Sequence, residues 1–378
     1  MKRYVHEKIG YIQEHSPQDE HVLIVPGART EVTHGDRSRV YSIAGPLVSR
    51  STRYRALLDL RALEEIIERE QPDLIESADP YQLGWAVAGI SRRRRIPAVA
   101  YYHSDFAEAY LRRPAQRLGE RFAAAAMQKA QSYRRALYNR FEVTLVSSET
   151  LAQQLRRSGV RRVTTVGLGV NLAVFRPEPD DASATRSAWE IPADRMVLLY
   201  VGRLAPEKNV RTLFAGFSLL ARRRPGDFQL VVVGDGQQRD ELRALQAATG
   251  AVTVLPYCGD SLELARLYRA ADIFVHPGTQ ETFGLVALES QACGTPVVGI
   301  RGSALDRIIL HEQSAWADEN TPEALAHAIE QCSVCDLRSL GGVATAAVAE
   351  RFAWPRIFDR LFCIYREVCA GYRRGAAG

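Results

Sequence analysis

Two carboxylates, Glu281 and Glu289, flank the start of a short predicted helix in the second half of the chain. They lie in the stretch HPGTQETFGLVALESQACGTPVVG, residues 276–299, with seven residues between them. Because like charges repel, neither carboxylate suits a phosphate group. A carboxylate accepts hydrogen bonds from hydroxyl groups, however, so this pair predicts a site for a polyhydroxylated ligand.

This helix, which follows Glu281 and carries Glu289, has a predicted N-terminus that suits an anion. Thr282 is placed to cap a helix over residues 283–292. The first amides of that helix, those of Phe283, Gly284 and Leu285, have no intrahelical partner and carry partial positive charge. Phosphate at the amides and hydroxyl groups at the carboxylates together predict a sugar nucleotide as ligand.

Two further loops follow predicted strands, where ligand-binding loops lie in open α/β sheets. The loop VGRLAPEKN carries Gly202 and two cations, Arg203 and Lys208, which could neutralise a departing diphosphate. The loop GDGQQ carries Gly234 and Gly236, whose missing side chains permit close backbone approach. Taken singly, such cations usually lie on a solvated surface, and a single GxG is weak evidence.

The order of elements predicts an α/β protein with two domains. Strands and helices alternate along the 378 residues, which indicates parallel sheets with helices on both faces. A proline-containing, acidic stretch at 176–192 is the expected link. We therefore expect an N-terminal domain at 1–175, a C-terminal domain at 176–352 and a closing helix at 353–378.

The N-terminal domain has an unusual predicted beginning. Residues 1–14 have the pattern of a helix, whereas an α/β domain of this kind normally starts with a strand and a Gly-rich loop. We expect the first strand of this domain to be missing, either because the start codon is placed too late or because the first unit has been lost.

Charge is distributed unevenly along the chain. Residues 1–172 hold 27 Lys and Arg against 19 Asp and Glu, a net +8, and the remainder holds 22 against 25, a net −3. The excess is concentrated at 92–95 and 112–140. Two interpretations stay open: a solvated, arginine-rich surface, or a face that meets an anionic membrane or acceptor. No known nucleic-acid module accompanies the charge, which argues against nucleic acid as a partner.

The composition favours a cytoplasmic protein. No run approaches the roughly 20 apolar residues of a membrane span, and no signal peptide opens the chain. The six cysteines are scattered, and we expect free thiols. Cys332 and Cys335 form a CxxC, but Cys363 and Cys369 have the wrong spacing for a zinc ribbon, so we expect no metal site.

The three motifs together, in this order and spacing, resemble the retaining glycosyltransferases of family 4. The resemblance implies the GT-B fold, in which two Rossmann-like domains with parallel sheets face each other across a cleft. It implies transfer of a hexose from GDP-mannose or a UDP-hexose to a lipid or glycan acceptor, without metal or cofactor. It is also compatible with a peripheral location at the inner membrane face.

The same resemblance implies roles for single residues. Glu281 would hold hydroxyls of the transferred sugar and Glu289 the ribose, while Arg203 and Lys208 would bind the diphosphate. His103, in AYYHSDF, would face the donor sugar, although a histidine at a strand end is more often structural. The remaining donor-binding residues implied are Gly202, Gly234, Gly236, Tyr257, Phe283, Gly284 and Leu285.

The family reaction needs no protein nucleophile: the acceptor attacks on the face that the diphosphate leaves. No Asp-x-Asp occurs in the chain, which fits metal independence. The sequence departs from the family's pattern in two places: the Gly-rich loop is absent, and Asp306 stands where the family has a glutamate. The alternative is therefore a nucleotide-sugar-binding protein without turnover. A phosphorylase is excluded because no lysine follows Lys208 to hold its cofactor, and no epimerase motif is found.

Overall fold

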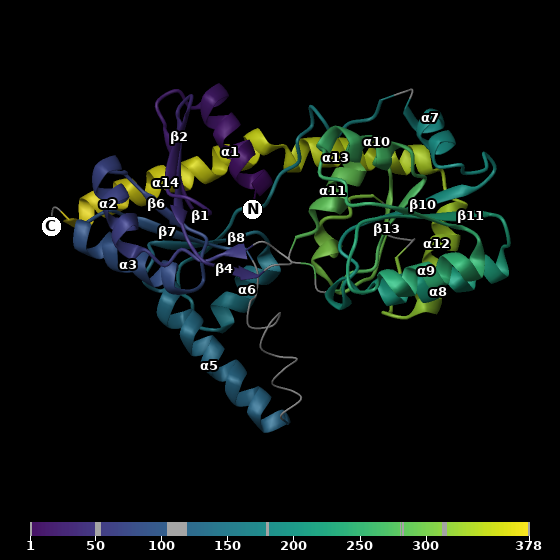
Figure 1. Ribbon diagram of the computed structural model, residues 1–378, viewed down its shortest axis with the longest axis horizontal. Coiled ribbons are helices and arrows are strands. Elements are labelled where there is room, and N and C mark those ends of the chain that lie inside the picture. Colours follow the sequence, from purple (N-terminus) through teal and green to yellow (C-terminus); the bar gives the residue numbers. More distant parts are fainter. Residues whose placement is uncertain are drawn as a thin grey trace. The chain divides into compact units, whose positions relative to one another are not determined.

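A computed structural model describes residues 2–49, 54–103, 119–178, 181–279, 281, 283–311 and 316–376 (Figure 1). The chain forms two compact units. The first comprises Met1–Gly167 and Trp354–Gly378, and the second comprises Leu168–Ala353. Each unit has its own hydrophobic core, and each combines parallel strands with covering helices, so the predicted α/β class is confirmed.

The second unit contains one five-stranded parallel sheet with the order β12-β11-β10-β13-β14. The chain runs outward from β10 to β12 and then returns to the other side of β10. This reversal between β10 and β13 is a topological switch point, where open α/β sheets bind ligands. The strands are β10 (Met196–Val201), β11 (Phe228–Val233), β12 (Val252–Leu255), β13 (Ile273–His276) and β14 (Val297–Gly299).

Helices cover both faces of this sheet because successive side chains of a strand point to opposite faces. Leu198 packs with Phe217 and Ile329 on one face, and Leu199 packs with Tyr268 and other side chains on the opposite face. The helices are α7 (Asp181–Ala188), α8 (Val210–Arg223), α9 (Arg239–Thr249), α10 (Ser261–Arg269), α11 (Leu285–Ala292), α12 (Pro322–Ser333) and α13 (Leu337–Phe352).

The first unit divides its described strands among separate sheets, with orders β1-β3-β2, β4-β5 and β6-β7-β8-β9. The last of these is parallel throughout. Its first described element is a helix, α1 (Lys2–His15), followed by β1. The strands are β1 (His21–Gly27), β2 (Glu31–Gly35), β3 (Ser38–Ala44), β4 (Leu47–Ser49), β5 (Tyr54–Arg55), β6 (Ile75–Ser77), β7 (Ala98–Tyr102), β8 (Val143–Val146) and β9 (Val163–Thr165).

Two strand pairs of the first unit depart from the expected parallel pattern, β4–β5 and β2–β3, which are both antiparallel. Strands β2 and β3 pair antiparallel through a tight turn in which Arg37 has a φ of 51°. All five residues of β2 are exposed, so the strand lacks the apolar alternation that would identify it in sequence. The helices of this unit are α1, α2 (Leu60–Glu70), α3 (Gln82–Arg94), α5 (Glu120–Tyr138), α6 (Glu149–Arg157) and α14 (Trp354–Ala376).

The C-terminal helix α14 packs on α1 within the first unit. Tyr11 donates a hydrogen bond to Asp359, and the ring of Tyr4 lies 5.8 Å from that of Phe358. The buried ammonium of Lys8 forms an ion pair of 3.2 Å with Glu76, which also accepts a hydrogen bond from Tyr365. A buried charge is stable only with such partners, and this cluster therefore ties α1, β6 and α14 together.

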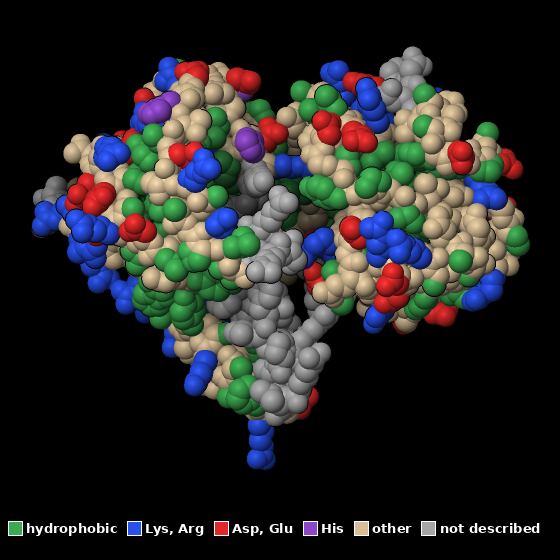
Figure 2. Space-filling model, in the orientation of Figure 1, with side chains coloured by type: hydrophobic (Ala, Val, Ile, Leu, Met, Phe, Trp, Pro, Cys, Tyr) green, Lys and Arg blue, Asp and Glu red, His purple; other side chains and the backbone are tan. Residues whose placement is uncertain are grey.

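The surface of the described residues mixes both signs of charge, as Figure 2 shows for one face. Within the arginine run 92–95, Arg93 lies 2.9 Å and Arg94 3.5 Å from Glu64. Residues 112–118 of the second basic segment lie outside the described residues. Among the described helices, none combines the length and the apolar character that crossing a bilayer requires.

Candidate active site

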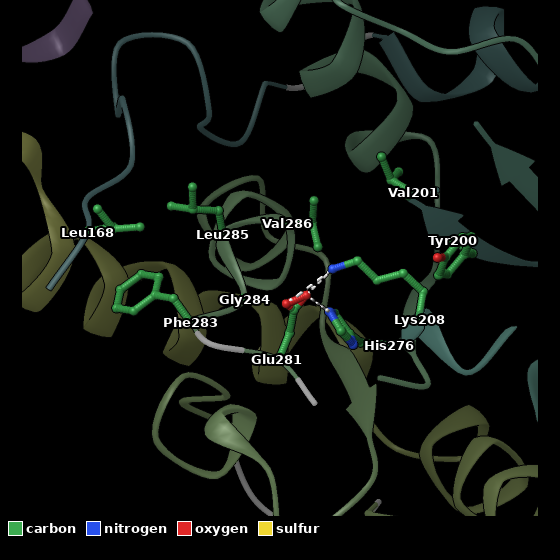
Figure 3. A pocket seen from close by; sticks show the side chains of 11 residues that line it. Leu168, Tyr200, Val201, Lys208, His276, Glu281, Phe283, Gly284, Leu285 and Val286 are labelled. Atoms are coloured by element: carbon green, nitrogen blue, oxygen red, sulfur yellow. Dashed lines mark hydrogen bonds and ion pairs between the residues drawn. The ribbon is translucent and has the colours of Figure 1, made fainter. Parts of the chain in front are cut away.

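A pocket of about 240 Å³ opens in the second unit at the carboxyl ends of β10 and β13 (Figure 3). This is the switch point of the sheet. Six residues singled out in the sequence line it: Gly202, Lys208, Glu281, Phe283, Gly284 and Leu285. Five further lining residues were not predicted: Leu168, Tyr200, Val201, His276 and Val286.

The centre of the pocket is an ion pair between Lys208 and Glu281 (Figure 3). The Lys208 ammonium donates to both carboxylate oxygens, one of them at 3.3 Å. The Glu281 side chain is 11% exposed and that of Lys208 30%. Burial acts to raise the pKa of Glu281, but His276 and Lys208 beside it act in the opposite direction, and the pKa lies below its usual value. The carboxylate is therefore ionised at neutral pH.

The loop that carries Lys208 is held by two residues that sequence reasoning missed. Lys208 ends a 3₁₀ helix, Pro206–Lys208, and Asn209 follows with a φ of 56°. The side-chain amide of Asn209 donates through Nδ2 to the carbonyl of Pro277 at 2.8 Å, which joins this loop to the one after β13. Tyr200 donates to the carbonyl of Arg203 at 3.0 Å. These bonds position the lysine, because they fix the backbone on either side of it.

The two predicted glycines of the GDGQQ loop lie behind the pocket and do not line it. A Cβ on Gly234 would lie 2.1 Å from the carbonyl oxygen of Gly202, and one on Gly236 would lie 2.3 Å from that of Leu204. Both distances are far too short for any side chain. The glycines therefore let the loop after β11 pack directly against the loop that carries Lys208.

The predicted start of the pocket helix is wrong by two residues. Helix α11 begins at Leu285, and Gly284, with a φ of 95°, occupies the position before it. A left-handed residue there keeps Phe283 out of the helix. The predicted cap, Thr282, lies outside the described residues. The amide of Ala287 already donates to the carbonyl of Gly284 at 3.0 Å, and the amides of Leu285 and Val286, which precede it at the pocket wall, have no backbone acceptor among the described residues.

Besides Gly234 and Gly236, three more predicted residues of the second unit do not line this pocket. Arg203 is 68% exposed and pairs with Glu207 at 3.2 Å. Tyr257 is 79% exposed. Glu289, on α11, is 2% exposed and accepts a hydrogen bond of 3.2 Å from Tyr268. The structure therefore brings Lys208 and Glu281 together but does not gather all the predicted contacts in one place.

His103 follows β7 in the first unit. Its ring stacks on that of Tyr101 with centroids 4.0 Å apart. Its Nε2 is buried and has no hydrogen-bond partner among the described residues. Burial lowers the pKa of His103 to about 4, so the imidazole is neutral at pH 7.

This pKa predicts a stability that depends on pH. The folded-state pKa lies below the ordinary 6.5, so the unfolded chain binds the proton first as the pH falls. As the pH falls from 6.5 to 4, protonation of His103 in the unfolded chain should therefore lower the free energy of unfolding by about 1–3 kcal/mol. Urea denaturation of His103→Gln should show a shallower loss of stability with falling pH than the wild type does. His34→Gln, in the exposed strand β2, is the control, and equal slopes for all three proteins would contradict the assignment.

Comparisons with known proteins identify the family of this chain. The family model described as Glycosyltransferase Family 4 matches residues 2–174, and the one described as Glycosyl transferases group 1 matches residues 181–336. A GDP-mannose-dependent alpha-(1-6)-phosphatidylinositol dimannoside mannosyltransferase of Mycobacterium tuberculosis is 34% identical over 310 residues, 81% of this chain and 77% of the relative.

A second relative and a solved structure extend this similarity. A GDP-mannose-dependent alpha-mannosyltransferase of Corynebacterium glutamicum is 31% identical, over 79% of this chain and 69% of the relative. The structure of a sucrose-phosphate synthase from Thermosynechococcus elongatus superposes with a TM-score of 0.75 at 24% identity, covering 98% of this chain and 93% of the other. The chain therefore belongs to glycosyltransferase family 4 and is a nucleotide-sugar glycosyltransferase with the GT-B fold.

Proposed function

We propose that this protein transfers a mannosyl residue from GDP-mannose to a lipid or glycan acceptor, with retention of configuration and without a metal ion. The observation that carries the proposal is the Lys208–Glu281 pair beside the first amides of α11, those of Leu285 and Val286. It combines a cation and amides for a diphosphate with a carboxylate for hydroxyl groups. The choice of GDP-mannose rests on the two mannosyltransferase relatives, whose names state that donor.

In the proposed reaction the bond between the anomeric carbon and the diphosphate oxygen breaks as the acceptor oxygen bonds to the same face of the sugar. The acceptor proton passes to an oxygen of the departing diphosphate. Lys208 and the amides of Leu285 and Val286 would stabilise the negative charge that develops on that leaving group. Glu281 would hold sugar hydroxyls and so fix the anomeric carbon relative to the acceptor.

We assign the other predicted residues to the same donor. Arg203 would turn from Glu207 toward the diphosphate, and Glu289 would accept hydrogen bonds from the ribose. Tyr257 would contact the base, and His103 would face the sugar as a neutral imidazole. Gly202, Gly234 and Gly236 would keep the loops close enough together for the diphosphate to approach the backbone.

The acceptor class follows from one relative and from charge. The mycobacterial relative acts on a phosphatidylinositol dimannoside, according to its name. The basic excess of residues 1–172 suits the same kind of acceptor, because it attracts anionic lipid headgroups. We therefore propose peripheral contact with the inner membrane face. The alternative, binding of a nucleotide sugar without turnover, has the same pocket and differs only in the outcome of a transfer assay.

A donor panel tests the proposal. We expect GDP-mannose and GDP to raise the melting temperature, and UDP-glucose, UDP and ADP to leave it unchanged, because a ligand at 100 times its Kd stabilises by about 2.7 kcal/mol. Radiolabelled mannose should then appear in phosphatidylinositol mannosides incubated with the protein, also in EDTA. Stabilisation by UDP sugars alone would contradict the proposed donor. Stabilisation by GDP-mannose without any transfer would establish the alternative.

A further inference from the structure

His276 is the last residue of β13 and forms the inner wall of the pocket, next to Glu281 (Figure 3). It is 4% exposed. Neither the diphosphate nor the sugar-hydroxyl role proposed above involves this side chain. A polar ring buried this deeply at the floor of a ligand pocket needs an explanation in terms of its partners.

The contacts of the ring determine which nitrogen carries its proton. The amide of Gly278 donates to Nδ1 of His276 at 3.2 Å, so Nδ1 presents its lone pair. In a neutral imidazole the hydrogen is then on Nε2. Burial lowers the pKa of His276, which keeps the ring neutral at pH 7. Nε2 lies 4.0 Å from Oε1 of Glu281, so the ring directs one N–H toward the carboxylate.

We propose that His276 is a positioning residue, whose Nε2–H holds the Glu281 carboxylate in place when Lys208 engages the donor diphosphate. The inference rests on the proposed function. In the structure Lys208 forms an ion pair with Glu281. In the proposed complex the same ammonium would instead face the donor diphosphate. As the lysine turns to the diphosphate, the buried carboxylate would lose its main partner. A move of about 1 Å brings it within hydrogen-bond distance of Nε2.

The glycine at 278 supports this assignment independently. A Cβ built there would lie 2.8 Å from Cε1 and 3.2 Å from Nδ1 of His276. Any side chain at this position would push the ring away from its present orientation. The loop is therefore shaped to the imidazole: its amide fixes the tautomer, and the absence of a side chain leaves the space that the ring needs. Gly278→Ala should therefore displace the ring without removing it.

Two substitutions at position 276 distinguish the effect of the N–H group from the effect of the packing of the ring. His276→Phe keeps an aromatic ring of similar size but has no donor, whereas His276→Gln carries an N–H group at similar reach. We expect His276→Phe to lower kcat for transfer about 10- to 100-fold, with the Kd for GDP within twofold of the wild type. His276→Gln should retain at least a fifth of wild-type kcat. Gly278→Ala should behave like His276→Phe, and His327→Phe, on the exposed face of α12, should behave like the wild type.

Calorimetry keeps this test independent of turnover. The ratio of the Kd for GDP to the Kd for GDP-mannose reports how well Glu281 holds the sugar. It should fall about 10-fold in His276→Phe and remain within threefold in His276→Gln, whether or not the wild type transfers mannose. No transfer by the wild type would count against the proposed function alone. Equal ratios in all variants, or equal losses in the Phe and Gln variants, would overturn the role of His276.

Discussion

Glu281→Gln should lower kcat/KM for mannosyl transfer at least about 100-fold while GDP still binds with unchanged affinity. The substitution keeps the size and shape of the side chain. It replaces an acceptor-only carboxylate, which can bind two sugar hydroxyls, by an amide with one acceptor oxygen. In the wild type the Lys208 ammonium forms an ion pair with the Glu281 carboxylate. In the variant it would face a neutral amide, whose NH₂ group cannot accept its hydrogen bonds. The sugar would lose its orientation, and the diphosphate contacts of the helix amides would remain.

The control for this variant is Glu241→Gln on α9. Glu241 also pairs with a cation, Arg211 at 2.7 Å, but that pair is on the surface of the same unit and outside the pocket. Steady-state transfer assays and GDP calorimetry should therefore match the wild type for Glu241→Gln. Wild-type turnover by Glu281→Gln would mean that the pocket does not hold the transferred sugar.

The sequence predicted which loops meet at the pocket better than it predicted the start of the pocket helix. Lys208 and Glu281 lie in separate loops, yet each follows a strand of strongly apolar character, and the carboxyl ends of adjacent parallel strands meet at one edge of the sheet. Their proximity therefore follows from local pattern together with topology. The helix start was misplaced because Gly284 was interpreted as helical, whereas its φ of 95° ends the loop there.

The supporting residues could not be found from local pattern. Asn209 bonds to Pro277 and, at 2.7 Å, to Asn320, partners that lie far along the chain and have no fixed spacing from it. The role of His276 could not be predicted from local sequence either, because it depends on the rotamer of Glu281 and on the backbone of Gly278. A position at the carboxyl end of β13 is the one signal that could have marked it.

In the first unit, an entire strand could not be predicted from the sequence pattern. Strand β2, EVTHG, is exposed at every position, so burial imposes no periodicity on it. Its pairing with β3 depends on the turn at Arg37. Buried strands such as β7, AVAYY, carry an uninterrupted run of apolar and aromatic residues, which is the pattern that identifies a buried strand in sequence.

Lys208→Met should lower kcat for transfer by about 10²- to 10³-fold, the usual effect of removing one oriented charge from a transition state. Methionine has nearly the length of lysine and removes its ammonium. Without that cation the pKa of Glu281 should rise, because burial raises it and Lys208 no longer lowers it, so the carboxylate would be protonated over a wider range of low pH. The residual activity of the variant should therefore increase with pH. Arg243→Met, on the exposed side of α9, is the control and should retain wild-type kinetics.

The double variant Lys208→Met/Glu281→Gln decides whether the two side chains act as one unit. If Lys208 both stabilises the leaving group and keeps Glu281 ionised, the second substitution removes a group that the first has already impaired. The combined loss of kcat/KM should then be much smaller than the product of the two single losses, with a coupling energy above about 1 kcal/mol. Multiplicative losses would show that the ion pair seen in the pocket has no part in catalysis, and that each residue contacts the donor independently.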